Sequence, residues 1–563
     1  MHATVYIIGI TVLLSPLTAA LLPGIAWSQP GMVLSYQKIS DTQGNFTAPI
    51  DDGDELGGAT AGLGDLDGGG PSVRAMAVGA AFDDDAGTDA GAVYIMFLAS
   101  NGAVLSYQKI NGASLPGQLG AGDEFGSALA FLGDLDGAGP SVGALAVGAT
   151  GDDDGGSNRG AVYILFLSSS GTVLSYQKIS DTQGNFLAPM LDSDEIGAAV
   201  AYLGDLDGAG SSVAALAAGA TGDNDGGADQ GAVYILFLAS NGTVLSYQKI
   251  SETAGGFPAV LESGDDFGGA LAALGDLDEA GPSVAALAVG AALDETPPAL
   301  PDANRGAVYI LFLASNGTVL SNQKLTNTDF PADGDQFGDA VANVGDLDGS
   351  GAGVRSLAVG VTGDDDGGTD KGAVYVLSLS ATATVLAFQK ISDFYGGFTA
   401  TFHPVDNLGS SLAALGDLDG AGPSVAAMAV GATGDDDGNT GNPLANRGAV
   451  YIMFLDGNSV AGVSGPPAVS SAFLGRARPN PFRPSTTIPF RLAQSALVQI
   501  DVLDVSGRLV RQLFREHAGP GEHSAVWDGR DDSGGALAPG TYFYRMSVDG
   551  RVTATAEKAL LLR

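Results

Sequence analysis

Carboxylates are the only abundant side chains in this sequence that could carry chemistry. The 563 residues include 64 Asp and Glu, 24 Lys and Arg, four His and no Cys, with a formal net charge of −40. The lack of Cys excludes disulfides, thiolate metal sites and cysteine nucleophiles, and four imidazoles leave little material for His-based catalysis. Nucleic acid and anionic membranes carry the same sign of charge as the chain. The composition therefore favours cations as partners.

The carboxylates follow an internal repeat. The phrase Gly-Asp-Leu-Asp occurs six times at intervals of 69 to 71 residues, which is typical of a repeat architecture. Each copy also carries Gly-Ala-Val-Tyr or a close match, and a run similar to Val-Leu-Ser-Tyr-Gln-Lys-Ile. The six aspartate pairs are Asp65 and Asp67, Asp134 and Asp136, Asp205 and Asp207, Asp276 and Asp278, Asp346 and Asp348, and Asp417 and Asp419.

Each copy predicts four strands, which we name A to D. In the second copy they cover Phe125–Leu132, Val142–Ala149, Ala161–Leu167 and Val173–Ile179. Strand C is continuously apolar, so it must be buried on both faces, as happens when four-stranded sheets stack radially in a β-propeller. Strands A to C occur six times, and a D-like run (Val33–Ile39) precedes the first copy. We therefore predict an all-β fold with a six-bladed propeller over residues 29–457, whose last blade is completed by the N-terminal strand.

At these residues the sequence resembles a known family. Phe125-Gly126 with Gly148-Ala149-Thr150 is similar to the two ends of an FG-GAP repeat, the unit of the integrin alpha-subunit propeller. The resemblance covers roughly residues 31 to 457 and implies the fold without naming a ligand.

The resemblance also implies calcium binding in the A-to-B turns, where the family carries alternating acidic residues. Calcium takes six to eight oxygens. Each copy keeps only the first two carboxylates, the twelve aspartates given above, and has Gly, Ala or Ser at the later ligand positions. Two interpretations stay open. Asp and Gly simply form the turn, or the turns bind calcium weakly with backbone and water oxygens completing the site.

Further acidic residues lie between strands B and C, such as Asp152 to Asp154, and before strand A, such as Asp123-Glu124. In an up-and-down blade both connections leave the same end, so we expect one strongly negative face. It would be a cation site or a docking surface for a basic partner, or it would serve only solubility. The repeated strand-D pairs, such as Tyr107 and Lys109, are interpreted as packing and local charge pairing.

The two ends of the chain predict export. Residues 1–28 resemble a secretory signal peptide with cleavage after Ser28, although the apolar stretch is also long enough for a retained anchor.

Residues 458–473 read as a linker. Residues 474–563 predict an Ig-like sandwich. Its motifs, including Pro479-Asn480-Pro481-Phe482 and Trp527-Asp528-Gly529-Arg530, resemble the type IX secretion sorting domain, which is related to the FlgD Ig-like domain. That resemblance implies delivery to the outer membrane; the alternative is a retained structural module.

Together these features favour a binding or adhesion protein, secreted or attached to the outer surface of a bacterium, with no catalytic residues. The expected partners are an unknown protein or glycan, either cationic or bridged by calcium, and the secretion machinery. Nucleic acid and a membrane span in the mature chain are not expected. Two alternatives stay open. One is a polysaccharide hydrolase or lyase that uses propeller carboxylates, and the other is a structural surface-layer spacer.

Overall fold

The computed structural model describes residues 30–457 and 472–562, apart from short gaps. These are 69–73, 138–142, 209–212, 278–283, 296–303, 327–334, 348–353, 366–367, 394, 421, 423–424, 438–444, 475–476, 478–479, 481, 493–495, 505–507, 519–520, 533, 549–550 and 553–556. The described residues form strands, turns and loops, with no helix. None of them therefore forms a helix able to cross a membrane. The predicted signal peptide (1–28) and most of the predicted linker (458–473) lie outside them. The chain divides into two compact units: Met1–Thr384 with Phe388–Ser459, and Val460–Arg563 with Val385–Ala387.

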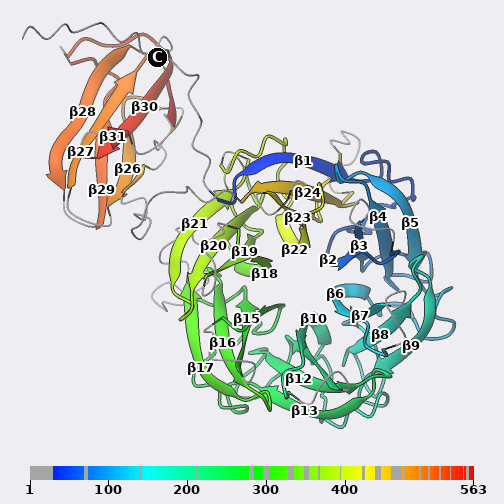
Figure 1. The fold of residues 1–563 in the computed structure, drawn as a ribbon. Helices are drawn as coiled ribbons and strands as arrows, with labels where there is room; N and C mark the ends of the chain where they lie inside the picture. Colours follow the sequence, from blue (N-terminus) through cyan, green and yellow to red (C-terminus); the bar gives the residue numbers. More distant parts are fainter. Residues whose placement is uncertain are drawn as a thin grey trace, which may run out of the picture. The chain divides into compact units, whose positions relative to one another are not determined.

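The first unit consists of six four-stranded antiparallel sheets, which Figure 1 shows around a ring. The strand that is first in each repeat lies nearest the centre, and the fourth lies at the rim. The strands are, sheet by sheet: β2 (Ala59–Gly64), β3 (Arg74–Ala80), β4 (Ala92–Leu98), β5 (Val104–Ile110); β6 (Phe125–Gly133), β7 (Gly143–Ala149), β8 (Ala161–Leu167), β9 (Val173–Ile179); β10 (Ile196–Gly204), β11 (Val213–Ala220), β12 (Ala232–Ala239), β13 (Val244–Ile250); β14 (Ala270–Gly275), β15 (Val284–Ala291), β16 (Ala307–Ala314), β17 (Val319–Thr326); β18 (Phe337–Gly345), β19 (Val354–Val361), β20 (Ala373–Ser380), β21 (Val385–Ile391); and β22 (Leu408–Gly416), β23 (Val425–Ala432), β24 (Ala449–Asp456), β1 (Val33–Ile39).

The four strands predicted for the second copy are found as β6 to β9, with ends that differ by at most one residue. Every residue of β8 is buried, as its unbroken apolar run requires, because the faces of neighbouring sheets cover both of its sides. The outer strand β9 is partly exposed. The burial of β8 and β9 thus follows the apolar pattern of their sequences.

Successive sheets pack so closely near the centre that only glycine fits. A Cβ atom added to Gly219 of the third sheet would lie 2.0 Å from the carbonyl oxygen of Gly268, at the start of the fourth. At Gly431 of the sixth sheet the same atom would lie 2.1 Å from the carbonyl oxygen of Gly57, which leads into the first. The last sheet thus packs against the first in the same way as interior neighbours do.

The N-terminal strand completes the sixth sheet, as predicted. β1 pairs antiparallel with β24, with Ile39 opposite Val450 and Val33 opposite Leu455. The two strands are more than 400 residues apart in the sequence and lie side by side (Figure 1). All six sheets consequently have four strands.

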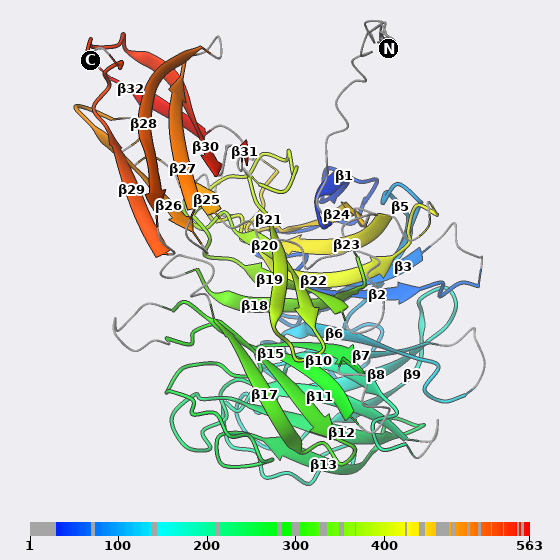
Figure 2. The same cartoon turned by 60° about the vertical axis from the view of Figure 1, so that its left-hand side comes forward.

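The second unit is a sandwich of two antiparallel sheets (Figure 2). One contains β25 (Ala472–Leu474), β26 (Thr486–Leu492) and β29 (Gly521–Trp527). The other contains β28 (Leu509–Ala518), β27 (Ala496–Leu503), β30 (Gly540–Val548), β31 (Arg551–Val552) and β32 (Glu557–Leu561). Trp527, Tyr544 and Phe482 are fully buried in its core.

Candidate functional site

Each of the six sheets contains the same buried polar group, which we call the Lys–Asp–Tyr cluster. A Lys of strand D forms an ion pair with an Asp of the B-to-C loop. In five sheets this Asp also accepts a hydrogen bond from a strand-C Tyr. The pairs are Lys109 with Asp83 (2.5 Å), Lys178 with Asp152, Lys249 with Asp223, Lys324 with Asp294, Lys38 with Asp435 (each 2.6 Å), and Lys390 with Asp364. In all six, the ammonium group lies 5.0 to 5.6 Å from the centre of a strand-C Tyr ring.

Inside a cluster the charges compensate each other. Burial lowers the pKa of Lys178, but its hydrogen bonds and attraction to Asp152 and Asp154 outweigh burial and raise that pKa above its usual value. Burial and the negative charge of Asp152 raise the pKa of Tyr163, which therefore donates its proton as a neutral hydroxyl. The Asp of each cluster thus serves as a buried counterion.

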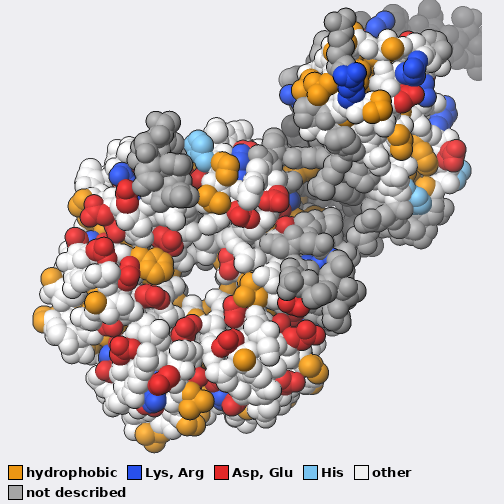
Figure 3. All heavy atoms as spheres, turned by 180° about the vertical axis from the view of Figure 1, so that it is seen from behind, with side chains coloured by type: hydrophobic (Ala, Val, Ile, Leu, Met, Phe, Trp, Pro, Cys, Tyr) orange, Lys and Arg blue, Asp and Glu red, His pale blue; other side chains and the backbone are white. Residues whose placement is uncertain are grey.

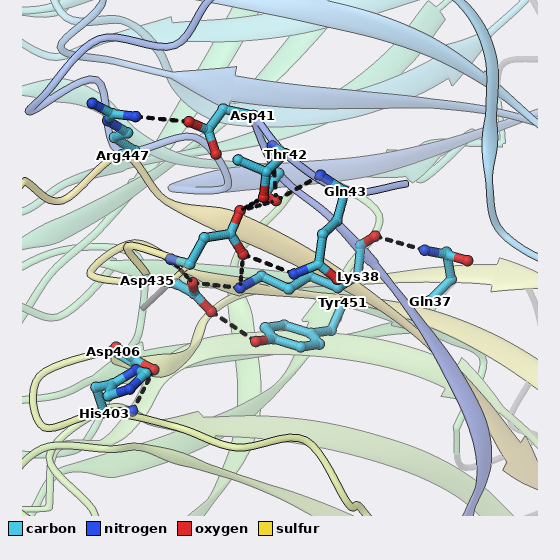
Figure 4. A network of polar contacts seen from close by, with 12 residues as sticks. Gln37, Lys38, Asp41, Thr42, Gln43, His403, Asp406, Asp435, Arg447 and Tyr451 are labelled. Atoms are coloured by element: carbon cyan, nitrogen blue, oxygen red, sulfur yellow. Dashed lines mark hydrogen bonds and ion pairs between the residues drawn. The ribbon is translucent and has the colours of Figure 1, made fainter. Parts of the chain in front are cut away.

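The sixth cluster joins the two ends of the first unit (Figure 4). Asp437 accepts hydrogen bonds from Ser40, Thr42 and Gln43, which directly follow β1, and pairs with Lys38 at 2.5 Å. These contacts bring together residues almost 400 positions apart. A pocket of about 240 Å³ lies beside them, lined in part by His403.

A second buried carboxyl precedes strand A in all six sheets, two residues before the first residue of the Phe-Gly-like pair; in the fifth sheet it is Asp335. In five sheets, one of its oxygens accepts the backbone N–H of the residue three positions earlier, at 2.6 to 2.8 Å. The five are Asp54, Asp123, Asp194, Asp265 and Asp406. Burial, with a nearby cluster Asp, raises the pKa of Asp54, Asp194 and Asp265 to about 6 and of Asp406 to about 7. Keeping these groups charged in the folded protein is therefore costly.

The next residue in each copy is half-buried and has a left-handed backbone conformation. Four of the six are acidic: Glu55, Glu124, Glu195 and Asp266, with φ between 53° and 59°. Burial raises the pKa of Asp266 to about 6, and repulsion from Asp229, Glu195 and Asp339 adds to the shift. Figure 3 shows acidic side chains around the opening of the ring on one face.

The predicted calcium residues lie at the ends of the A strands. Ten of the twelve aspartates are described; Asp278 and Asp348 lie outside the described residues. Asp417 accepts the backbone N–H of Gly422 at 3.2 Å, which is a turn contact. No group of three or more His, Asp or Glu able to hold a metal ion occurs within the described segments. Each described turn therefore offers at most two carboxylates.

The prediction for the B-to-C loops needs correction. The sequence predicts that their aspartates and those before strand A crowd one strongly negative face. The two sets do lie close together, since Asp83 acts on the pKa of Asp54. However, the first Asp of each loop is buried and neutralised by Lys, because a charge removed from water requires a partner. The strand-C tyrosines of the clusters were missed, although a hydroxyl in a continuously apolar strand indicates a buried acceptor.

Comparison with known proteins bears on the second unit. Residues 483–551 match the FlgD Ig-like domain family. The matched segment contains β26 to β30, which form most of the sandwich. No curated protein matches the sequence.

Several solved structures resemble parts of the chain. FlgD from P. aeruginosa is 28% identical over 14% of this chain and 61% of its own, with a TM-score of 0.12. PorZ, an essential bacterial surface component of the type IX secretion system of Porphyromonas gingivalis, is 11% identical over 87% of this chain and 58% of its own, with a TM-score of 0.26. The α-L-arabinofuranosidase Arb93A from Fusarium graminearum is 11% identical over 76% of this chain and 98% of its own, with a TM-score of 0.41. The chain thus spans about three fifths of the first two proteins.

Proposed function

We propose that this protein is a six-bladed β-propeller of the FG-GAP type that binds a partner outside the cell. The observation that carries the proposal is the sixfold repetition of one arrangement around the ring. A buried Lys–Asp–Tyr cluster recurs in every sheet, and further carboxyls lie before strand A. The clusters are neutral inside, but the half-buried acidic residues before strand A and the acidic side chains around the ring opening on one face (Figure 3) suit a cationic or calcium-bridged protein or glycan.

We propose binding without catalysis. A catalytic carboxylate normally differs from its neighbours in environment and pKa. Here the raised pKa of about 6 is shared by equivalent residues in several sheets, and the cluster aspartates are tied to Lys. Loss of a polysaccharide-cleaving activity on Asp294→Asn substitution would instead establish the hydrolase or lyase alternative.

The binding test uses the purified chain with both units. It is screened on a glycan array and used to capture proteins from neighbouring cells. We expect a partner whose binding weakens as salt rises from about 50 to 500 mM, because exposed charges are screened over ~8 Å at physiological salt. The triple variant Glu124→Gln, Glu195→Gln, Asp266→Asn should reduce binding. Binding that is unaffected by both salt and the triple variant would contradict a charged docking face.

The match of residues 483–551 to the FlgD Ig-like family, with the motifs around it, supports delivery by the type IX secretion system to the outer surface or medium. Deleting residues 474–563 should leave the propeller folded in the periplasm. A matched control deletes only the predicted linker residues 460–470 and should be exported. Export of the 474–563 deletion at the normal level would refute an address in this domain.

At the A-to-B turns we propose weak calcium binding. Two carboxylates fall short of the six to eight oxygens that calcium takes, so backbone and water oxygens would supply the rest. The expected dissociation constant is on the order of 10⁻⁴ to 10⁻³ M, the range of extracellular modules. Titration calorimetry should detect heat with calcium, and Asp134→Asn with Asp136→Asn should reduce it. No heat and no change in melting temperature at millimolar calcium would assign these residues to turn formation alone.

A further inference from the structure

The third sheet contains a pocket of about 280 Å³ beside its Lys–Asp–Tyr cluster. We call it the third-sheet pocket. Leu191 and Asp194 line it from the D-to-A loop before β10, Asp223 and Asp225 from the B-to-C loop, and Tyr247 and Lys249 from β13. Every one of these side chains belongs to one sheet or to the loop that leads into it.

Two of the three carboxylates in this pocket already have a positive partner. Lys249 lies 2.6 Å from both Asp223 and Asp225. Asp223 also accepts hydrogen bonds from the Tyr234 hydroxyl at 3.2 Å and from the backbone N–H of Asp225 at 3.0 Å. The single ammonium group of Lys249 is therefore shared between these two aspartates.

Asp194 differs from both. Asp194 is only 2% exposed, and its Oδ2 accepts a hydrogen bond from the backbone N–H of Leu191 at 2.6 Å. Its Oδ1 is buried and accepts no hydrogen bond from any described residue. A buried carboxylate oxygen without a donor costs free energy, which a ligand that brings a donor would recover.

On its D-to-A side the pocket has an exposed apolar residue where the first sheet has a carboxylate. Leu191 lines the pocket and is 60% exposed, and Asp51 occupies the equivalent position before β2. The Tyr247 ring, 37% exposed, also lines the pocket. An exposed leucine beside a carboxylate and an aromatic ring favours a ligand that is both apolar and positively charged.

We propose that the third-sheet pocket binds the ammonium group of a lysine side chain, flanked by apolar residues, on a partner polypeptide. Three carboxylates against one Lys leave the pocket negative. A single available oxygen suits the point charge of an ammonium group better than the two-pronged guanidinium of Arg. The Tyr247 ring offers a cation–π surface, and Leu191 would cover an apolar neighbour of the lysine. This assignment names a partner class and rests on the proposed binding function.

The test measures the binding of three tripeptides to the chain from which residues 1–28 are removed. Binding is followed by titration calorimetry or NMR at constant ionic strength. Acetyl-Leu-Lys-Leu-amide should bind at least tenfold more tightly than its norleucine analogue, which lacks the charge, and than its arginine analogue. Equal binding of the arginine or norleucine peptide would overturn the ammonium assignment. Displacement of the lysine peptide by glucose at millimolar concentration would instead identify a pocket for neutral hydroxyls.

Two substitutions locate the site. Asp194→Asn removes the charge and keeps the shape, and it should weaken binding of the lysine peptide at least tenfold. Leu191→Asn changes a mostly exposed side chain, so it should fold normally and weaken binding severalfold. Asp54→Asn, the matched control in the first sheet, should leave binding unchanged. Wild-type affinity in Leu191→Asn and Asp194→Asn would overturn the proposal.

Failure of this inference can be told apart from failure of the proposed function. A natural partner that binds the wild type and Asp194→Asn equally would reject the pocket and retain the binding function. Tripeptide binding that depends on Asp194, with no natural partner found, would retain the pocket and count against the wider function.

Discussion

At the scale of single residues, the Lys–Asp–Tyr clusters are the most sensitive points of the fold. Asp152 and Lys178 are both almost fully buried and lie 2.6 Å apart. Asp152→Ala would leave the buried Lys178 ammonium group with only the partly exposed Asp154 as a counterion, so we expect the free energy of unfolding to fall by at most about 3–5 kcal/mol. Tyr163→Phe, which loses one hydrogen bond to Asp152, should cost only about 1 kcal/mol.

Denaturant unfolding in calcium-free buffer measures both changes, with Asp136→Ala in an exposed turn as the control. The control should stay within about 0.5 kcal/mol of the wild type. Equal effects of Asp152→Ala and Asp136→Ala would show that the buried pair adds nothing to stability.

The buried carboxyls before strand A predict an unusual pH dependence. Their pKa of about 6, or about 7 for Asp406, exceeds the ordinary value of 3.8. The folded state therefore binds more protons than the unfolded state between about pH 4 and pH 7, so stability should fall as pH rises through this window. Hydrogen bonds and ion pairs lower the pKa of Asp154 and Asp437, and their contribution is lost below about pH 4.

The melting temperature should consequently peak near pH 5. Asp406→Asn, which removes the ionisation while keeping a side-chain oxygen, should flatten the decline between pH 5 and pH 8. A melting temperature that rises steadily from pH 5 to pH 8 would contradict this account.

At the scale of elements, β1 is the strand on which the sixth sheet depends. It pairs with β24 along its length, and Lys38 supplies the counterion of Asp435. Deleting residues 1–39 would expose β24, a strand that is wholly buried, as a free edge able to pair with another chain. We expect this variant to aggregate or to elute as oligomers in size-exclusion chromatography. Deleting only residues 1–28 should give the wild-type profile, and a monomeric, stable 1–39 deletion would refute the closing role of β1.

At the largest scale, the sixth sheet of the first unit packs on the segment that leads into the first sheet, as interior neighbours do. In Gly431→Ala the new Cβ atom would lie 2.1 Å from the carbonyl oxygen of Gly57. In Gly219→Ala the new Cβ atom would lie 2.0 Å from the carbonyl oxygen of Gly268. Since each substitution forces two sheets apart, both should lower the melting temperature by similar amounts, by several degrees. Gly58→Ala, whose Cβ would have no neighbour closer than 3.5 Å, should be nearly neutral. A harmless Gly431→Ala beside a damaging Gly219→Ala would indicate an open array.

Local pattern was enough to predict the strands and the completion of the last sheet by the first strand. Burial on both faces requires an apolar run such as Ala161–Leu167, and counting strands left Val33–Ile39 without a sheet of its own. Both features follow from hydrophobic burial along short segments, which the sequence shows directly.

Only the tertiary structure decided which charges meet. Lys109 and Asp83 are 26 residues apart and Lys38 and Asp435 are 397 apart, yet both pairs have the same geometry. Whether an Asp is a counterion, a turn residue or a carboxylate with an oxygen to spare, as in Asp194, depends on the register of strands and loops around it. Composition and spacing record the charge of a side chain, but its partner is set by distance in the folded chain.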